Sequence, residues 1–284
     1  MFERLSRSWQ LVKASAAVLR QDHKLLLFPL ISTMALLAVL TSFAIPMLGW
    51  LALGGSAGRG LSQGSGLLAL TAFLFYLSQY FIVFFFNAAL VAAAMIRLDG
   101  GTPTMADGLR AAAARWLAIL GYAALAATVG LALRALAERV GFVARIVTGL
   151  LGVGWSLATY LVVPVLVARN MGPLDAVKES ADILKRTWGE NLMGQAGLGS
   201  AFALLQFLVL LLGGALVVTF VVQGSTILTV LSLLLTLGAL LLGWLVHGAL
   251  NGIYAAALYR YAEGSGNTQG FDARVLEQAF IVRA

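Results

Sequence analysis

The sequence predicts an all-α, polytopic membrane protein with six transmembrane helices. Of its 284 residues, 61% are hydrophobic and 11% are charged, whereas a soluble domain has about 45–50% apolar and about 25% charged residues. A soluble chain of this length has too little interior to bury so much apolar surface. The charges form short clusters between long apolar runs, which is typical of a chain that crosses a membrane several times.

Six apolar runs reach the length of about 20 residues that a helix needs to cross the hydrocarbon core. They cover roughly residues 25–50, 67–96, 116–133, 146–168, 196–222 and 226–259. The first run is longer than the apolar core of a cleaved signal peptide, so we expect a retained span. The short QGST turn at Gln223 predicts that the last two runs form a hairpin. Between the third and fourth runs, residues 134–145 have apolar positions at helical spacing and predict a separate interfacial helix.

The distribution of Lys and Arg predicts the orientation of the chain. Fifteen of the 19 Lys and Arg lie in the N-terminal segment, the second and fourth loops and the C-terminal tail, and four lie in the first and third loops. Because cytoplasmic loops carry the excess of Lys and Arg, both termini are expected in the cytoplasm. The predicted location is the bacterial inner membrane, with the chain crossing it several times.

Two related amphipathic segments each precede an apolar run, LVKASAAVLRQDHKLLLFP from Leu11 and AVKESADILKRTWGENL from Ala176. In both, apolar residues recur every three or four positions, for example Leu174, Val177 and Leu184, and the cations lie off that stripe. We expect helices in the cytoplasmic interface, with the apolar stripe toward acyl chains and the cations on anionic headgroups. The predicted headgroup contacts are Arg4, Arg7, Lys13, Arg20, Lys24, Lys178, Lys185 and Arg186.

Similar phrases recur along the chain, which predicts a single membrane domain, 1–284, built from three repeat units. The spans that return to the cytoplasm end alike, in AAAMIRLDGG, VPVLVARNMG and AAALYRYAEG. The predicted units are roughly 1–98, 99–170 and 171–262, each an interfacial helix followed by a helical hairpin, and 263–284 is an amphipathic tail. All units enter from the same side, so the repeat is parallel. The alternative is that restricted composition makes unrelated membrane loops similar.

The opening FERLSRSWQLVKASAAVLRQDHKLLLFP resembles a family of uncharacterised bacterial membrane proteins, a domain of unknown function. The pattern of hairpins and amphipathic helices is more loosely similar to the membrane domain of some glycerophosphodiester phosphodiesterases. Neither resemblance implies catalytic residues, because this sequence lacks the soluble phosphodiesterase barrel and its acidic metal ligands.

The apolar runs contain no Asp, Glu, Lys or Arg, which argues against a carboxylate-based proton pump because such groups mark ion pathways. The chain has no cysteine and two histidines, so neither a metal site nor a cofactor is predicted. A GxSxG sequence at residues 54–58 follows a predicted span rather than a strand, so we interpret it as a linker. We identify no catalytic residue.

Neutral polar residues remain inside the runs, and they define a candidate polar layer. His247, Asn251 and Tyr254 share one helical face, and Asn87 and Asn251 lie at similar depths before Arg97 and Arg260. The layer is either a solute site or a set of interhelical hydrogen bonds. Gly248 and Gly252 form a GxxxG pattern for helix packing against another span or a second copy. The full candidate layer is Gln79, Asn87, Gln206, His247, Asn251 and Tyr254.

The leading hypothesis is a non-catalytic accessory, scaffold or lipid-associated module whose partners are membrane lipids. A homo-oligomer or a membrane-protein partner is compatible with it, and nucleic acid is not expected because the cations form no basic face. The first alternative is a passive channel or facilitator that uses Asn87, His247 and Asn251. The second is a membrane-associated enzyme that uses acids of the cytoplasmic loops, namely Asp99, Asp107, Asp175 and Asp182.

Overall fold

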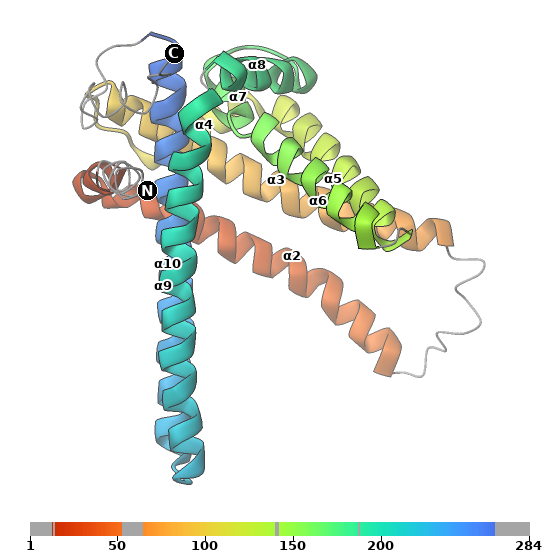
Figure 1. The fold of residues 1–284 in the computed structure, drawn as a ribbon, viewed down its shortest axis with the longest axis vertical. Helices are drawn as coiled ribbons and strands as arrows, with labels where there is room; N and C mark the ends of the chain where they lie inside the picture. Colours follow the sequence, from red (N-terminus) through yellow and green to blue (C-terminus); the bar gives the residue numbers. More distant parts are fainter. Residues whose placement is uncertain (1–12, 14, 53–64, 140–141, 187, 265–284) are drawn as a thin grey trace. The chain divides into compact units, whose positions relative to one another are not determined.

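A computed structural model describes residues 13, 15–52, 65–139, 142–186 and 188–264 (Figure 1). These described residues are predominantly helical and contain no strand. Six of the helical stretches are long and apolar enough to cross a membrane: His23–Ile45, Leu70–Leu98, Trp116–Glu138, Ile146–Ala168, Gly199–Val222 and Thr226–Ala262. The predicted all-α class and the six spans are confirmed, and the chain is a multi-pass membrane protein.

The chain divides into two compact units, each assembled from separate stretches. The first unit is Met1–Leu26, Ala94–Thr102 and Thr187–Ala284, and the second is Leu27–Ala93 and Pro103–Arg186. The predicted division into repeats at 1–98, 99–170 and 171–262 stays a prediction, and the tail 265–284 lies outside the described residues.

The second unit contains most of the helices. They are α2 (Leu27–Ala52), the larger part of α3 (Ser65–Leu98), α4 (Met105–Ala114), α5 (Trp116–Arg139), α6 (Phe142–Ala158), α7 (Val162–Ala168) and α8 (Pro173–Arg186). The amphipathic helix α8 packs on α5, α6 and α7. Close packing at the start of α4 depends on Gly108, because a Cβ there would lie 2.5 Å from the carbonyl oxygen of Ala89 on α3.

The predicted span 146–168 is interrupted between α6 and α7. Pro164 has no N–H with which to bond the carbonyl of Tyr160, and its ring opposes helix at that point. The backbone turns there, with Tyr160 N bonded to Leu157 O at 3.1 Å and Val162 N to Thr159 O at 3.2 Å. The buried N–H of Leu161 donates instead to the hydroxyl of Ser180 on α8, at 3.0 Å. A side chain from a neighbouring helix therefore accepts the hydrogen bond of a backbone N–H at the break.

The prediction of a separate interfacial helix over residues 134–145 is wrong. Helix α5 continues to Arg139 and α6 begins at Phe142. Arg134 stabilises the extension, because its Nε is 3.0 Å from Glu138 Oε1 one turn later and its Nη1 donates to the hydroxyl of Tyr76 on α3 at 2.8 Å. These partners make the segment a continuation of the spanning helix.

The first unit is dominated by the hairpin of α9 (Trp188–Val222) and α10 (Thr226–Ala262), which run side by side (Figure 1). The turn expected at Gln223 is confirmed, with Gly224 in the left-handed region at φ 72° and Ser225 N bonded to Phe220 O at 3.1 Å. Gly213 on α9 faces Thr236 on α10, and a side chain at Gly213 would overlap it. The short 3₁₀ helix η1 (His23–Leu26) also contacts α10.

Candidate functional site

Charged and polar side chains join the ends of helices within the first unit. Arg260, near the end of α10, forms an ion pair with Asp99, which follows α3. Arg97 donates to Gln21 Oε1 at 3.1 Å and to the carbonyl of Gly101 at 3.2 Å. These contacts link three separate stretches of the sequence, and they occupy the arginines that end two spans.

The second unit has a comparable charged end. Arg169, which follows α7, pairs with Glu179 on α8 at 3.1 Å, and Arg115 donates to Asn170. At the start of α4, Thr104 and Asp107 form a capping box. The Thr104 hydroxyl is 2.6 Å from Asp107 Oδ2. Bonds from the hydroxyl and backbone N–H of Thr104 hold the pKa of the Asp107 carboxyl below its ordinary value.

The loop acids considered for catalysis are engaged with neighbours. Asp99 pairs with Arg260, and Asp107 caps α4. Asp175 and Asp182 lie 3.6 and 3.5 Å from the ammonium groups of Lys178 and Lys185, at i,i+3 spacing. Surface pairs of this kind are typical of a solvated helix face. Among the described residues, no group of three or more His, Asp and Glu could hold a metal ion.

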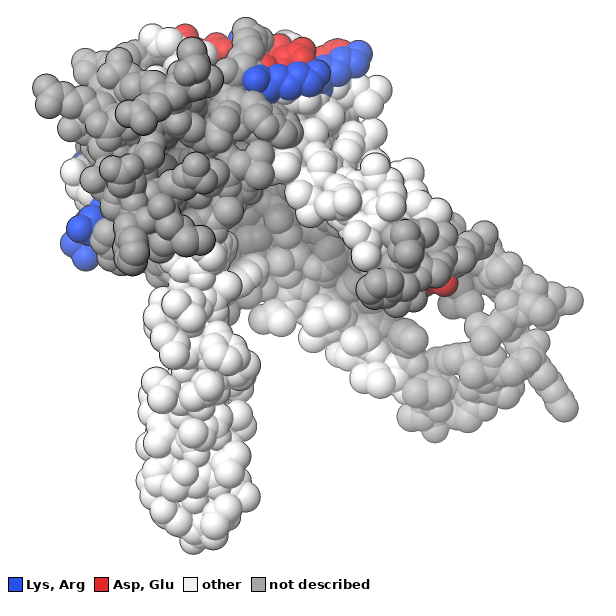
Figure 2. All heavy atoms as spheres, in the orientation of Figure 1, with Lys and Arg blue, Asp and Glu red and all other residues white. Residues whose placement is uncertain are grey.

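The predicted headgroup cations that the structure describes are exposed. Lys13, Arg20 and Lys24 are exposed, and the side chains of Lys178 and Lys185 on α8 are 77% and 72% exposed. Figure 2 shows basic and acidic side chains gathered over α8 and uncharged surface along the visible part of the hairpin α9–α10. Arg4, Arg7 and the side chain of Arg186 lie outside the described residues.

Helix α8 buries one face against its own unit. The buried residues include Ala176, Ser180, Ile183 and Leu184, while Leu174 of the predicted apolar stripe is exposed. The aligned N-terminal segment behaves similarly, because its Ser15, Val18 and Leu19 are also buried. The packed face of α8 therefore differs in part from the predicted stripe and includes a serine that periodicity alone did not identify.

Two members of the candidate polar layer lie in the hairpin α9–α10. Gln206 on α9 donates from Nε2 to the carbonyl of Leu240 on α10, at 2.9 Å. Gly243 makes room for this amide, because a Cβ there would lie 2.8 Å from Nε2. The ring of His247 packs against Phe202, with centroids 4.9 Å apart, and its Nδ1 is buried with no hydrogen-bond partner among the described residues. Gln206 therefore links the two helices of the hairpin.

The other members of the candidate layer are divided between the two units. Asn251 is half-buried and Tyr254 buried on α10, in the first unit, whereas Gln79 and Asn87 are half-buried on α3, in the second unit. The layer of Asn87, His247 and Asn251 stays a prediction. Gly248 is half-buried and Gly252 is buried, and their role in helix packing also stays a prediction.

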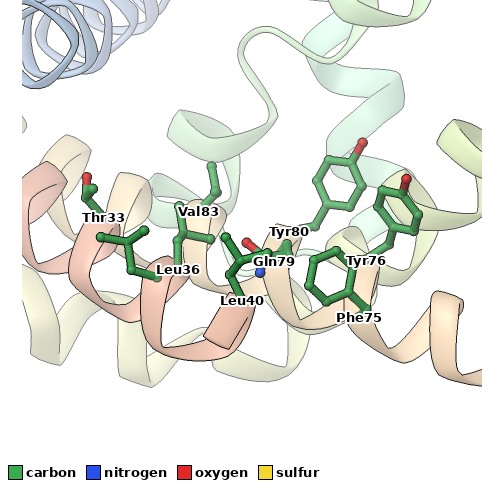
Figure 3. A pocket seen from close by; sticks show the side chains of 9 residues that line it. Thr33, Leu36, Leu40, Phe75, Tyr76, Gln79, Tyr80 and Val83 are labelled. Carbon is green, nitrogen blue, oxygen red and sulfur yellow. The ribbon is translucent and has the colours of Figure 1, made fainter. Parts of the chain in front are cut away.

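Sequence patterns did not predict the groove between α2 and α3. It has a volume of about 390 Å³ and is lined by Thr33, Leu36, Leu37, Leu40, Phe75, Tyr76, Gln79, Tyr80 and Val83. Figure 3 shows Gln79 between Val83 at one end of the groove and Phe75 and Tyr76 at the other. The Gln79 Nε2 atom is buried and has no partner in the described part of the chain. Only Gln79 was detectable beforehand, as a polar residue within an apolar run.

Comparison with curated proteins finds no match to this chain. The loose similarity to the membrane domain of glycerophosphodiester phosphodiesterases and the bacterial origin stay predictions. Residues 67–271 match the DUF6159 family, a family of unknown function. That match covers all of the chain from the second span to just beyond the sixth, so this integral membrane protein belongs to the DUF6159 family.

Proposed function

We propose that the protein is a non-catalytic, lipid-associated scaffold of the bacterial inner membrane. The main supporting observation is the position of α8. One face of this helix packs on α5–α7, so the opposite face presents Lys178 and Lys185 outward. Such a face suits anionic headgroups. The pairing of all four candidate loop acids also favours a structural role over a catalytic one.

We further propose that both chain ends lie in the cytoplasm and that the repeats are parallel. The excess of Lys and Arg in the N-terminal segment, the second and fourth loops and the C-terminal tail supports the orientation. Two equivalent contacts in the second unit support the repeat. The close approach of Gly108 to Ala89 has its counterpart in the bond from Leu161 N to Ser180. A shift of 72 residues takes Ala89 to Leu161 and Gly108 to Ser180. The same shift takes Trp116, which begins α5, to Trp188, which begins α9. A duplicated segment accounts for this common register, because composition alone would not preserve matching contacts.

Lipid retention tests the scaffold proposal. The variant Lys178→Glu/Lys185→Glu and the matched variant Lys178→Arg/Lys185→Arg would be purified and placed in nanodiscs with phosphatidylglycerol. One cation near an anionic surface contributes about 1 kcal/mol. Losing two, about 2 kcal/mol, should therefore reduce phosphatidylglycerol retention by about thirtyfold. Native mass spectrometry measures the retained lipid. The arginine variant should behave as wild type, and unchanged retention in the glutamate variant would contradict the proposal.

A passive channel or facilitator is the second candidate, favoured by the buried Nδ1 of His247, which has no partner among the described residues. A polar atom of this kind within a spanning helix is expected to meet water or a solute. Ion and small-solute flux into proteoliposomes should fall in His247→Ala and stay unchanged in His23→Ala, whose side chain is exposed on η1. Absence of flux through the wild-type protein would eliminate this candidate.

A further inference from the structure

We infer that the groove between α2 and α3 binds one zwitterionic phospholipid of the phosphatidylethanolamine type. One acyl chain lies along the groove, an ester carbonyl accepts a hydrogen bond from Gln79, and the headgroup lies at Arg134 and Glu138. This inference deepens the proposed lipid association. It depends on the helices spanning a membrane and does not depend on which side faces the cytoplasm.

The lining of the groove suits an acyl chain. Leu36 and Leu40 from α2 face Phe75 and Val83 from α3, and the volume of about 390 Å³ lies within the range of about 300–1,000 Å³ for ligand sites. Thr33, which also lines it, donates its hydroxyl to the carbonyl of Pro29 at 2.7 Å. The walls therefore offer apolar contact along most of their length, and in a bilayer the apolar molecules available are lipids.

Gln79 supplies a hydrogen-bond donor in this lining. Its Nε2 is buried and unpaired among the described residues, and a polar group left unsatisfied in hydrocarbon costs several kcal/mol. A phospholipid brings ester carbonyls, which accept hydrogen bonds, to the boundary between headgroup and acyl chains. Gln79 lies three residues, or about 4.5 Å of helix, beyond Tyr76 toward the apolar end at Val83. The order of Tyr76, Gln79 and Val83 along α3 therefore matches the order of headgroup, ester and acyl chain in a phospholipid.

The headgroup end of the groove carries both signs of charge. Arg134 on α5 donates from Nη1 to the Tyr76 hydroxyl at 2.8 Å and from Nε to Glu138 at 3.0 Å. The side chains of Arg134 and Glu138 are each 65% exposed. A guanidinium beside a carboxylate complements a headgroup that has a phosphate beside an ammonium. An anionic headgroup without an amine would leave Glu138 facing added negative charge, so the pair favours the zwitterionic lipid.

Photo-crosslinking of the full chain in nanodiscs tests the acyl-chain position. The probes are phosphatidylethanolamine and phosphatidylglycerol, each with a diazirine on one acyl chain, and labelled peptides are identified by mass spectrometry. Val83→Trp fills the groove and should reduce labelling of α2 and α3 by the ethanolamine lipid by about tenfold. The control is Leu74→Trp, which places the same bulk on an exposed position of α3 that does not line the groove. In this variant the labelling of α2 and α3 should stay at the wild-type level.

The polar contacts are tested by smaller changes. Gln79→Leu should reduce the labelling about fivefold, as expected for one lost hydrogen bond. Its control is Ser78→Ala, because the Ser78 hydroxyl bonds to the carbonyl of Leu74 in its own helix. Arg134→Ala should reduce labelling, and the exchange Arg134→Glu/Glu138→Arg, which keeps both charges, should restore most of it.

Three results would overturn the inference. Labelling unchanged by both Val83→Trp and Gln79→Leu would mean that the groove holds no specific lipid. Labelling of the exposed hairpin α9–α10 at the same level would mean that the probe reports only surrounding lipid. Equal labelling by phosphatidylglycerol would refute the headgroup assignment. The lysines of α8 stay intact in every variant, so failure here is distinguishable from failure of the proposed scaffold function.

Discussion

At the scale of single residues, Gly108 controls how closely α4 approaches its neighbours. A Cβ at this position would lie 2.5 Å from the backbone oxygen of Ala89 and 2.7 Å from the ring of Phe28. Backbone cannot yield as the end of a flexible side chain can, so Gly108→Ala should destabilise the protein by about 1–3 kcal/mol, as overpacking does. The apparent melting temperature in detergent, followed by fluorescence size-exclusion, measures this loss.

The matched control for that prediction is Gly149→Ala. Gly149 lies within α6, and nothing stands within 4 Å of an added Cβ. Alanine there should be neutral or stabilise the helix by up to about 1 kcal/mol. Equal loss of stability in both variants would mean that the approach of α4 to α3 is not the cause.

Asp107 gives a pH-dependent prediction at the same scale. Because the Thr104 hydroxyl and N–H lower its folded-state pKa, the stability that Asp107 contributes is complete above the unfolded value of about 4. It is lost as the pH falls through the still lower folded value. The melting temperatures of wild type and Asp107→Asn should therefore differ at pH 6 and converge on acidification below about pH 4. A difference that persists in acid would contradict this role for the carboxylate.

At the scale of elements, the break between α6 and α7 depends on α8. The buried N–H of Leu161 has the Ser180 hydroxyl as its acceptor, so Ser180→Ala should cost about 1–3 kcal/mol, the penalty of an unsatisfied buried donor. Ser156→Ala is the control, since that hydroxyl bonds to Gly152 O within its own helix and is exposed. Thermal unfolding of the two variants measures the difference. A loss of equal size in both would show that the break needs no support from α8.

Elements were predictable where one physical cause decided them. The six spans follow from the length of the apolar runs, and the α9–α10 turn follows from Gly224 in a short polar stretch. The separate helix expected at 134–145 failed because Arg134 bonds to Tyr76, 58 residues away, a contact invisible to helical periodicity. The groove was missed for the same reason, since its lining depends on how α2 and α3 pair.

At the scale of the whole molecule, the shift of 72 residues connects sequence and packing. The same shift relates Arg97 to Arg169 and Trp116 to Trp188. Each arginine follows or ends a span, and each tryptophan follows the next amphipathic helix, α4 or α8. Gly108 and Ser180 are equivalent points of contact on these two amphipathic helices. A polar side chain serves one contact and a glycine the other, so the proposed repeat would preserve the positions of the contacts while their chemistry differs. Each of the three proposed repeats should then have the same orientation in the membrane.

The proposed orientation can be tested without altering native thiols, because the chain has no cysteine. Lys185→Cys places a single thiol on exposed α8, and Gln223→Cys places one in the exposed α9–α10 turn. The excess of Lys and Arg predicts that α8 faces the cytoplasm and that the turn, one span later, faces outward. A membrane-impermeant maleimide applied to intact cells should label Gln223→Cys, and it should label Lys185→Cys only after permeabilisation. The reverse pattern would invert every cytoplasmic assignment while leaving the six spans in place.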